Sequence, residues 1–216
     1  MSKVYQEQPT SEFRFHKLVF YIKTQIPKFR LRSKKDSTLM QLLSVVLFFN
    51  KDFLDKYVTT IYPSVYVPDL PWDKQPVESR ITTLAHEYVH LKDRERLGWL
   101  FNILYLSPQI FALLAIGAIW NSWWLLSLLF LLPWPSPGRA WLEARAYKVT
   151  IVLHWHLTKR EISPFWIREQ FTGTNYYWMW PFKKDVERRT QIAIENSKSG
   201  KFLSPEILEI LEALEV

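Results

Sequence analysis

Cysteine is absent from the 216 residues of this chain. A disulfide framework and a thiolate metal site are therefore both excluded, and any metal would have to be bound by histidine and carboxylate side chains. The sequence also has no internal repeat and no low-complexity tract. Because 48% of the residues are hydrophobic, we expect a packed core rather than disorder.

An apolar stretch is missing from the first 17 residues, whereas a secretory signal peptide needs a run of about 7–15 apolar residues. We therefore expect the N-terminus to stay on the side of the membrane where it is synthesised. Residues 1–35 are interpreted as a basic N-terminal segment, with five cations in residues 28–35. This cluster is typical of a solvated loop, and a patch for anionic lipid is the alternative.

Acidic residues are in the minority, and the net charge is +7. A basic protein can bind nucleic acid, anionic lipid or an acidic partner, and charge alone does not choose among them. No helix-turn-helix signature is present and cysteine zinc fingers are impossible, so we expect no nucleic acid partner. Aromatic residues make up 16% of the chain, with eleven Trp, which is typical of interfaces with protein or membrane.

Hydrophobic periodicity predicts a mainly α fold with a small edge sheet, in three regions. The N-terminal segment 1–35 precedes a core at residues 36–163, and residues 164–216 form an aromatic connector with C-terminal helices. One or two strands are predicted within residues 58–70, and residues 13–26 are predicted as a strand or short helix. Helices are predicted over residues 39–57, 78–106, 139–157, 183–196 and 205–215.

The most informative motif lies in residues 82–90, TTLAHEYVH, which contain the pattern H-E-x-x-H as His86, Glu87 and His90. In a helix, residues i and i+4 lie on one face, so both imidazoles can reach one ion at about 2 Å. Glu87 flanks that face, where it can take a proton from a zinc-bound water and return it to the leaving amine. The neighbouring apolar residues are typical of a helix buried in a domain: Ile81, Leu84, Ala85, Val89 and Leu91.

A third ligand is needed to complete such a site. The spacing H-E-x-x-H-x-x-G-x-x-H is excluded, because Asp93 and Arg96 stand where it requires Gly and His. The downstream candidates are Glu143, His154 and His156. Glu143 is the best of these, because it lies in a predicted helix whose small alanines would allow another helix to approach closely. It would complete a His₂Glu site with an open position for water, and the alternative is an ordinary surface glutamate.

A strand, an H-E-x-x-H helix, a hydrophobic insertion and a helix with E-x-x-A follow one another over about residues 57–157. This order resembles the gluzincin metallopeptidases, and most of all their membrane-linked branch, the CAAX-prenyl protease and heat-shock membrane protease type. The resemblance implies a zincin-like α+β fold, a bound Zn²⁺ and a peptide or protein substrate. It also implies that His86, His90 and Glu143 are the zinc ligands and that Glu87 is the general base.

One position departs from that family pattern. The family usually places Asp four residues after the ligand Glu, where it orients a ligand His, and this chain has Tyr147 there. Tyr147 and Arg145 are therefore candidates for orienting a ligand or stabilising the oxyanion, and Tyr176 and Tyr177 are further oxyanion candidates. The same departure motivates the alternative of a non-catalytic, zincin-like scaffold in a larger assembly such as a virus particle.

Charged residues are absent throughout residues 97–138. This run exceeds the length of a membrane span, but a single crossing would place Glu143 and His86 on opposite sides of the bilayer. Pro108 and Pro133 bracket two apolar arms, so we predict a hairpin at about residues 107–135. Each arm is roughly 18 Å long as a helix, against a hydrocarbon core of roughly 30 Å. The predicted turn residues are Gly117, Asn121 and Ser122.

Tryptophans mark both ends of this hairpin: Trp120, Trp123 and Trp124 at the tip, and Trp99, Trp134 and Trp141 near the base. Trp prefers boundaries between polar and apolar surroundings. Lys and Arg outnumber Asp and Glu on both flanks, which is typical of segments on the cytoplasmic side of a membrane. We therefore expect the hairpin to enter a membrane from that side. Burial against a protein partner, in an oligomer or a large soluble assembly, is the alternative.

Overall fold

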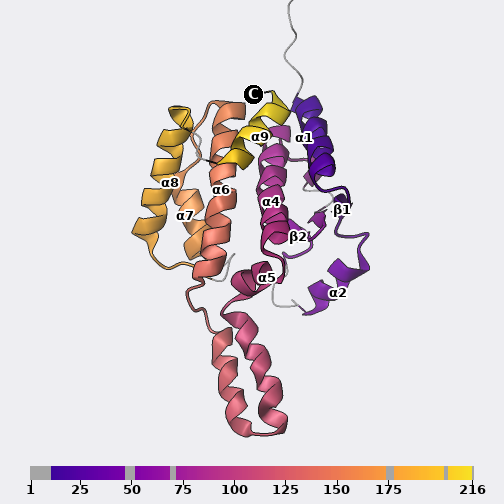
Figure 1. The fold of residues 1–216 in the computed structure, drawn as a ribbon, viewed down its shortest axis with the longest axis vertical. Helices are drawn as coiled ribbons and strands as arrows, with labels where there is room; N and C mark the ends of the chain where they lie inside the picture. Colours follow the sequence, from indigo (N-terminus) through magenta and orange to yellow (C-terminus); the bar gives the residue numbers. More distant parts are fainter. Residues whose placement is uncertain (1–10, 47–51, 69–71, 174–177, 202–203, 216) are drawn as a thin grey trace, which may run out of the picture. The chain divides into compact units, whose positions relative to one another are not determined.

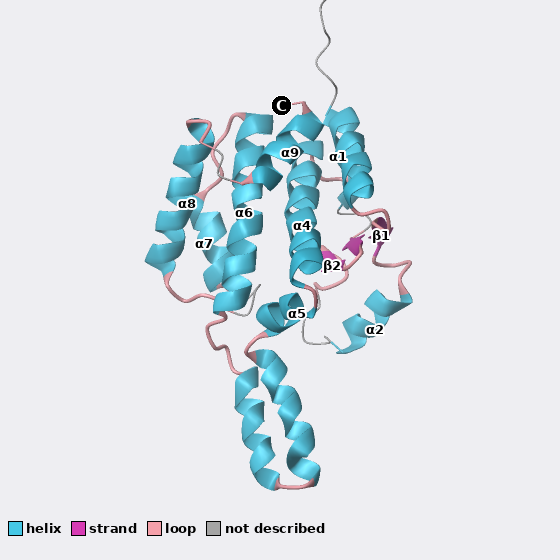
Figure 2. Ribbon diagram, viewed as in Figure 1, coloured by secondary structure: helices cyan, strands magenta, loops and turns pink. Residues whose placement is uncertain are grey.

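The computed structural model of the chain is mainly helical with one small sheet, which confirms the coarse fold prediction (Figure 2). It describes residues 11–46, 52–68, 72–173, 178–201 and 204–215. The chain divides into two compact units: the first is Met1–Leu91 with Ser204–Val216, and the second is Lys92–Leu203. The division falls within one continuous helix, α4 (Val77–Leu97).

The first unit is built around the packing of α1 (Ser11–Gln25) on α9 (Pro205–Leu214), two helices from opposite ends of the chain (Figure 1). Helix α1 buries Phe15, Leu18 and Ile22, which recur at helical spacing on one face. Helix α9 begins with a proline at its first turn, a position where the missing N–H costs nothing. Tyr21 of α1 donates a hydrogen bond to Glu209 Oε2 of α9 at 2.8 Å.

A three-stranded sheet completes the first unit, with the order β1-β3-β2. Strand β1 (Arg30–Ser33) pairs in parallel with β3 (Ser64–Val67), and β2 (Thr59–Ile61) pairs with β3 in the antiparallel direction. The strands predicted within residues 58–70 are therefore confirmed as β2 and β3. All four residues of β3 are buried, which is typical of a central strand.

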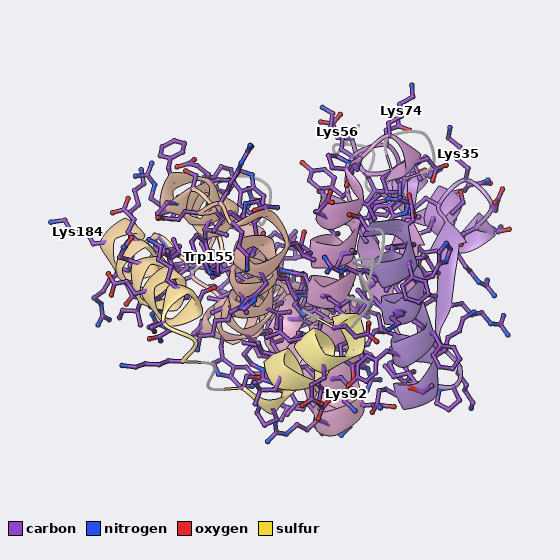
Figure 3. All side chains as sticks on the ribbon, turned by 90° about the horizontal axis from the view of Figure 1, so that it is seen from above. Lys35, Lys56, Lys74, Lys92, Trp155 and Lys184 are labelled. Atoms are coloured by element: carbon purple, nitrogen blue, oxygen red, sulfur yellow. The ribbon has the colours of Figure 1, made fainter. Side chains whose placement is uncertain are left out.

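The basic cluster at residues 28–35 contains strand β1, so the predicted loop is wrong for Arg30–Ser33. Lys34 donates its backbone N–H to the Val67 carbonyl at 2.9 Å, which extends the pairing of β1 with β3. Its side chain is fully buried, whereas the side chain of Lys35 is exposed and points outward (Figure 3). Sheet pairing therefore decides which of two adjacent lysines meets water.

Two predicted helices are shorter in the structure than in the sequence analysis. The helix expected over residues 39–57 is α2 (Thr38–Val46), and residues 52–56 form turns. The helix expected over residues 78–106 breaks into α4 and α5 (Trp99–Leu106) at Gly98, whose φ is 58°. A glycine adopts this left-handed conformation without the Cβ clash of other residues, so the chain can turn there.

The uncharged run forms a hairpin of two short helical arms, η1 (Gln109–Ile119) and η2 (Ser122–Leu131), as the sequence predicted (Figure 1). Asn121 lies in the turn and caps η2, and Ser122 is the first residue of η2, but Gly117 lies inside η1 and not in the turn. A Cβ on Gly117 would lie 2.7 Å from Cγ of Trp124, so the glycine makes room for that ring. Among the described residues, no single helix is long and apolar enough to cross a membrane. Helices α5 and η1 meet that test by length and composition only as a pair bent by 93°.

The second unit packs α6 (Pro137–Thr158), α7 (Pro164–Thr172) and α8 (Lys183–Lys198) around one core. Helix α7 lies inside the predicted aromatic connector, and Pro164 occupies its first turn. The core residues come from all three helices and the segment before α8: Ala140, Tyr147, Ile151, Ile167, Phe171, Met179, Val186 and Ile194.

Candidate metal centre

Helix α4 presents both histidines of the motif on one buried face, as predicted. His86 is 6% exposed and His90 is 5% exposed. Their ring centroids lie 4.9 Å apart, with an interplanar angle of 78°. The apolar residues around the motif are buried as well, so the helix is embedded in the protein and the direction of both imidazoles is fixed. These residues are Ile81, Leu84, Ala85, Val89 and Leu91.

Glu143 of α6 belongs to the same group. His86, His90 and Glu143 are all buried, and one potential ligand atom from each lies within 4.8 Å of the others. Ligand atoms on a tetrahedral ion with bonds of about 2.0–2.2 Å are roughly 3.3–3.6 Å apart, so the largest spacing would close by about 1.5 Å at most. The group could therefore hold a metal ion. Two imidazoles and a carboxylate suit zinc and other divalent first-row metals, so the donor set does not specify which one.

Glu87 is half-buried beside the first histidine, and its carboxylate is oriented by the sheet. Thr60 of β2 donates a hydrogen bond from Oγ1 to Glu87 Oε2 at 2.7 Å. Within the described sheet, β2 is an edge strand, because only β3 pairs with it. The candidate base therefore adjoins a strand whose outer edge can accept another extended chain.

A buried lysine lies in the electrostatic surroundings of Glu87. Lys34 donates a hydrogen bond from Nζ to the Phe53 carbonyl, and its ammonium lies 4.0 Å from the centroid of the Phe53 ring. Burial lowers the pKa of Lys34 from 10.5 to about 8, while attraction to Glu87 and Asp55 opposes that shift. Sequence reasoning missed this residue, because nothing in the cationic cluster distinguishes Lys34 from its neighbours.

Tyr105, at the end of α5, donates a hydrogen bond from Oη to Glu143 Oε1 at 2.8 Å. Arg139 in turn donates from Nε to the Tyr105 carbonyl at 2.6 Å. Burial lowers the pKa of the Arg139 guanidinium below its ordinary value, while Tyr105 and Glu143 oppose that shift. The sequence analysis missed Tyr105, although it is the single tyrosine in the uncharged run of residues 97–138.

Tyr147 is buried in the core of the second unit. Its ring centroid lies 5.5 Å from that of Phe171 and 6.0 Å from that of Trp166, so its ring packs α6 against α7. A role for Tyr147 at a metal ligand stays a prediction. The other two tyrosines considered for the oxyanion, Tyr176 and Tyr177, lie outside the described residues.

Arg145 forms an ion pair with Asp93. The pair joins Nη2 to Oδ1 and Nε to Oδ2, each at 3.2 Å, and the Asp93 side chain is 2% exposed. Asp93 is buried against α6 through this pair. On the surface of α4, Lys92 pairs with Glu95 at 3.6 Å. The role of Arg145 toward an oxyanion stays a prediction.

The two other histidines considered as third ligands lie further along α6 and outside the group formed by His86, His90 and Glu143. His154 and His156 are half-buried. Burial lowers the pKa of each below its ordinary 6.5, with further lowering by Arg160 and Lys159 respectively. Of the three candidates, Glu143 is therefore the one that the structure brings to the motif.

No protein-family model, curated protein or solved structure matches this chain.

Proposed function

We propose that this protein is a zinc-dependent metalloendopeptidase of the gluzincin type, which hydrolyses peptide bonds in a peptide or protein substrate. The observation that carries the proposal is the buried group of His86, His90 and Glu143. Glu87, from the same motif, is half-buried beside it. This combination is what peptide hydrolysis at a His₂Glu site needs: ligands for the ion and a carboxylate base next to them.

A zinc ion bound there would polarise the scissile carbonyl and lower the pKa of the attacking water. In this mechanism Glu87 takes a proton from that water and delivers it to the leaving amine. The hydrogen bond from Thr60 restricts the rotation of the Glu87 carboxylate, so the base is oriented before the substrate binds. Tyr105 and Arg139 support the Glu143 side of the site through their hydrogen bonds.

Strand β2 suggests how a peptide would reach the base. An extended peptide can add to an edge strand through main-chain hydrogen bonds, which bind it without requiring a particular sequence. Because Thr60 lies on β2 and contacts Glu87, a peptide paired with β2 would run past the base. This arrangement favours an extended or unfolded substrate segment over a folded one.

The hairpin supports association of the enzyme with a membrane. Its apolar side chains are exposed, with Ile119 at 79%, Trp120 at 81% and Trp123 at 73%. Backbone groups at its tip are paired locally, because Asn121 accepts a hydrogen bond from Trp123 N at 3.0 Å and Asn121 N donates to the Gly117 carbonyl at 3.1 Å. This pairing lowers the cost of moving the turn out of water. A protein partner in a larger assembly is the alternative occupant.

A non-catalytic scaffold is the second candidate function. The observation that favours it is the packing of Tyr147, whose ring lies among Trp166 and Phe171 at the position where the resembled family has Asp. A site that lacks this orienting carboxylate would bind metal less firmly. In such a protein the exposed hairpin, and not the metal, would carry the function.

The deciding experiment measures cleavage and zinc content together in wild type, Glu87→Gln and Glu95→Gln. Glu95 is a matched control, because it lies on the same helix and pairs with Lys92 on its surface. We expect Glu87→Gln to lower the cleavage of a peptide library, followed by mass spectrometry, by about 10²–10⁴-fold while zinc content is unchanged. Equal cleavage by Glu87→Gln and Glu95→Gln would rule out the proposed mechanism. Zinc binding without cleavage in any variant would favour the scaffold.

A further inference from the structure

The base of the hairpin lies directly against the helix that carries Glu143. A Cβ on Gly138, in the first turn of α6, would approach the Leu104 carbonyl oxygen of α5 to 2.7 Å. Ser136, which is 1% exposed, donates from Oγ to the carbonyl of Ser107. The backbones of α5 and α6 are therefore held together at the point where the hairpin begins and ends.

Three side chains connect this junction to Glu143. Arg139 donates from Nη2 to Gln109 Oε1 at 3.2 Å, and Gln109 is the first residue of η1. Arg139 also donates from Nε to the Tyr105 carbonyl, and its guanidinium lies 5.3 Å from the centroid of the Tyr105 ring. Phe101 stacks on Tyr105 with ring centroids 5.7 Å apart. The phenol is thus fixed on both sides while it donates to Glu143 Oε1.

A carboxylate that binds a metal can rotate about its terminal bond and can use one oxygen or both. A hydrogen bond donated to one of the oxygens fixes this rotation and favours ligation through a single oxygen. Glu143 is fully buried, so water cannot replace the donor at low cost. The hydroxyl of Tyr105 is therefore suited to orient Glu143 toward an ion shared with the two histidines.

We propose that Tyr105 is a positioning residue of the metal centre, and that Arg139 links it to the first residue of the hairpin. The inference rests on the proposed metal-binding role of His86, His90 and Glu143. Through this link the base of the hairpin helps to orient Glu143. Anything that holds the hairpin in place should therefore strengthen metal binding, and a bound metal should in turn stabilise the base of the hairpin. The uncharged run thus serves the metal centre as well as docking.

The test compares the zinc dissociation constants of wild type, Tyr105→Phe and Tyr21→Phe, measured on the whole chain by competition with a chromophoric chelator at neutral pH. Both substitutions remove a phenolic oxygen that donates to a carboxylate at 2.8 Å, but the partner of Tyr21 is Glu209 of α9 and not a candidate ligand. We expect Tyr105→Phe to weaken zinc binding by about 10–100-fold. Tyr21→Phe should bind zinc as wild type does.

A second variant, Arg139→Gln, tests the link to the hairpin. Its smaller amide cannot reach both the Tyr105 carbonyl and Gln109, so zinc binding should weaken by less than in Tyr105→Phe. Circular dichroism and thermal denaturation of the metal-free proteins should be alike for all variants, which separates lost positioning from lost folding.

Each result has one interpretation. Equal zinc affinity in Tyr105→Phe and wild type overturns the positioning role and leaves the proposed peptidase standing. Lost cleavage with unchanged zinc affinity also overturns it, because Tyr105 would then act on the reacting atoms. Wild type that binds no zinc overturns the metallopeptidase, and this inference with it.

Discussion

At the scale of single residues, one carboxyl group and one amino group are fully buried, those of Glu143 and Lys34. A buried charge destabilises a folded protein unless neighbouring groups compensate it. Glu143 accepts a hydrogen bond from Tyr105, and Lys34 donates one to the Phe53 carbonyl. Buried ionisable groups with such specific partners are characteristic of functional sites, and both lie near the motif residues that we assign to catalysis.

Lys34 makes the stability of the protein depend on pH in a window set by its two pKa values. The unfolded chain keeps the Lys34 proton up to about its ordinary pKa of 10.5, whereas the folded chain keeps it only to about 8. Between these values the unfolded state binds more protons, so the free energy of unfolding rises with pH. The cost of burying the charge is present in full below pH 8 or so and is relieved as the pH approaches 10.5.

The measurement is urea denaturation of wild type, Lys34→Met and Lys35→Met at about pH 7 and about pH 10. Wild type should gain on the order of 1–3 kcal/mol relative to Lys34→Met between these conditions. Lys35→Met should follow wild type, because the Lys35 side chain is exposed. If the unfolding free energy of all three proteins changed equally between the two pH values, Lys34 would stay charged in the folded protein across this range.

At the scale of elements, glycines decide where helices turn and how closely they approach. Gly98 ends α4 with a φ of 58°, and Gly138 lets α6 begin against the backbone of α5. The sequence pattern predicted one helix through Gly98, because apolar residues continue at helical spacing on both sides. Periodicity alone did not register the break, although the charged residues of α4 give way to the uncharged run at this glycine.

Replacing Gly138 tests the contact between α5 and α6. Gly138→Ala should lower the unfolding free energy by about 1–3 kcal/mol, because the new Cβ must displace the Leu104 carbonyl. Gly200→Ala is the control for backbone strain, since its φ is +69° and a Cβ there meets no atom within 4 Å. That control should cost about 1 kcal/mol. Unchanged thermal stability of Gly138→Ala would mean that the two helices do not need this close approach.

At the scale of the whole molecule, the hairpin is the main exposed apolar surface of the described residues. Its length indicates which partner could cover it. Eleven residues in η1 at about 2.0 Å per residue give an arm of roughly 22 Å. That length enters a bilayer deeply but does not cross a hydrocarbon core of roughly 30 Å. Side chains on both arms are exposed, with Leu113 and Ile116 at 64% and Leu126 at 57%. Lipid would cover such a surface evenly without a shaped partner, so a membrane is the occupant that we propose.

Flotation with vesicles of phosphatidylcholine and phosphatidylglycerol tests this docking on the full chain. Trp120→Ser with Trp123→Ser should lower the bound fraction by about tenfold or more, because two large apolar side chains no longer enter the bilayer. Trp166→Ser with Trp178→Ser is the control, since these residues are 45% and 41% exposed outside the hairpin. Equal flotation of both variants and wild type would exclude the tip as the membrane contact. A discrete oligomer without vesicles would favour a protein partner.

The sequence by itself determined the helical class, the hairpin and the three residues of the buried group that could hold a metal ion. These follow from local rules. Helical spacing places His86 and His90 on one face, a long uncharged run must be covered by lipid or protein, and prolines mark the starts of helices. The topological argument that the run must double back, so that Glu143 can reach the motif, agrees with the two arms of the hairpin.

Only the tertiary structure decided which polar side chains are buried and what they contact. Lys34 and Lys35 are equivalent in sequence, yet sheet pairing buries the first alone. Tyr147 has the expected spacing from Glu143 but packs in the core, whereas Tyr105 donates to that carboxylate from 38 residues away. The physical reason is that a hydrogen bond depends on the distance and direction between atoms on different elements, and packing sets these after the local pattern has been satisfied.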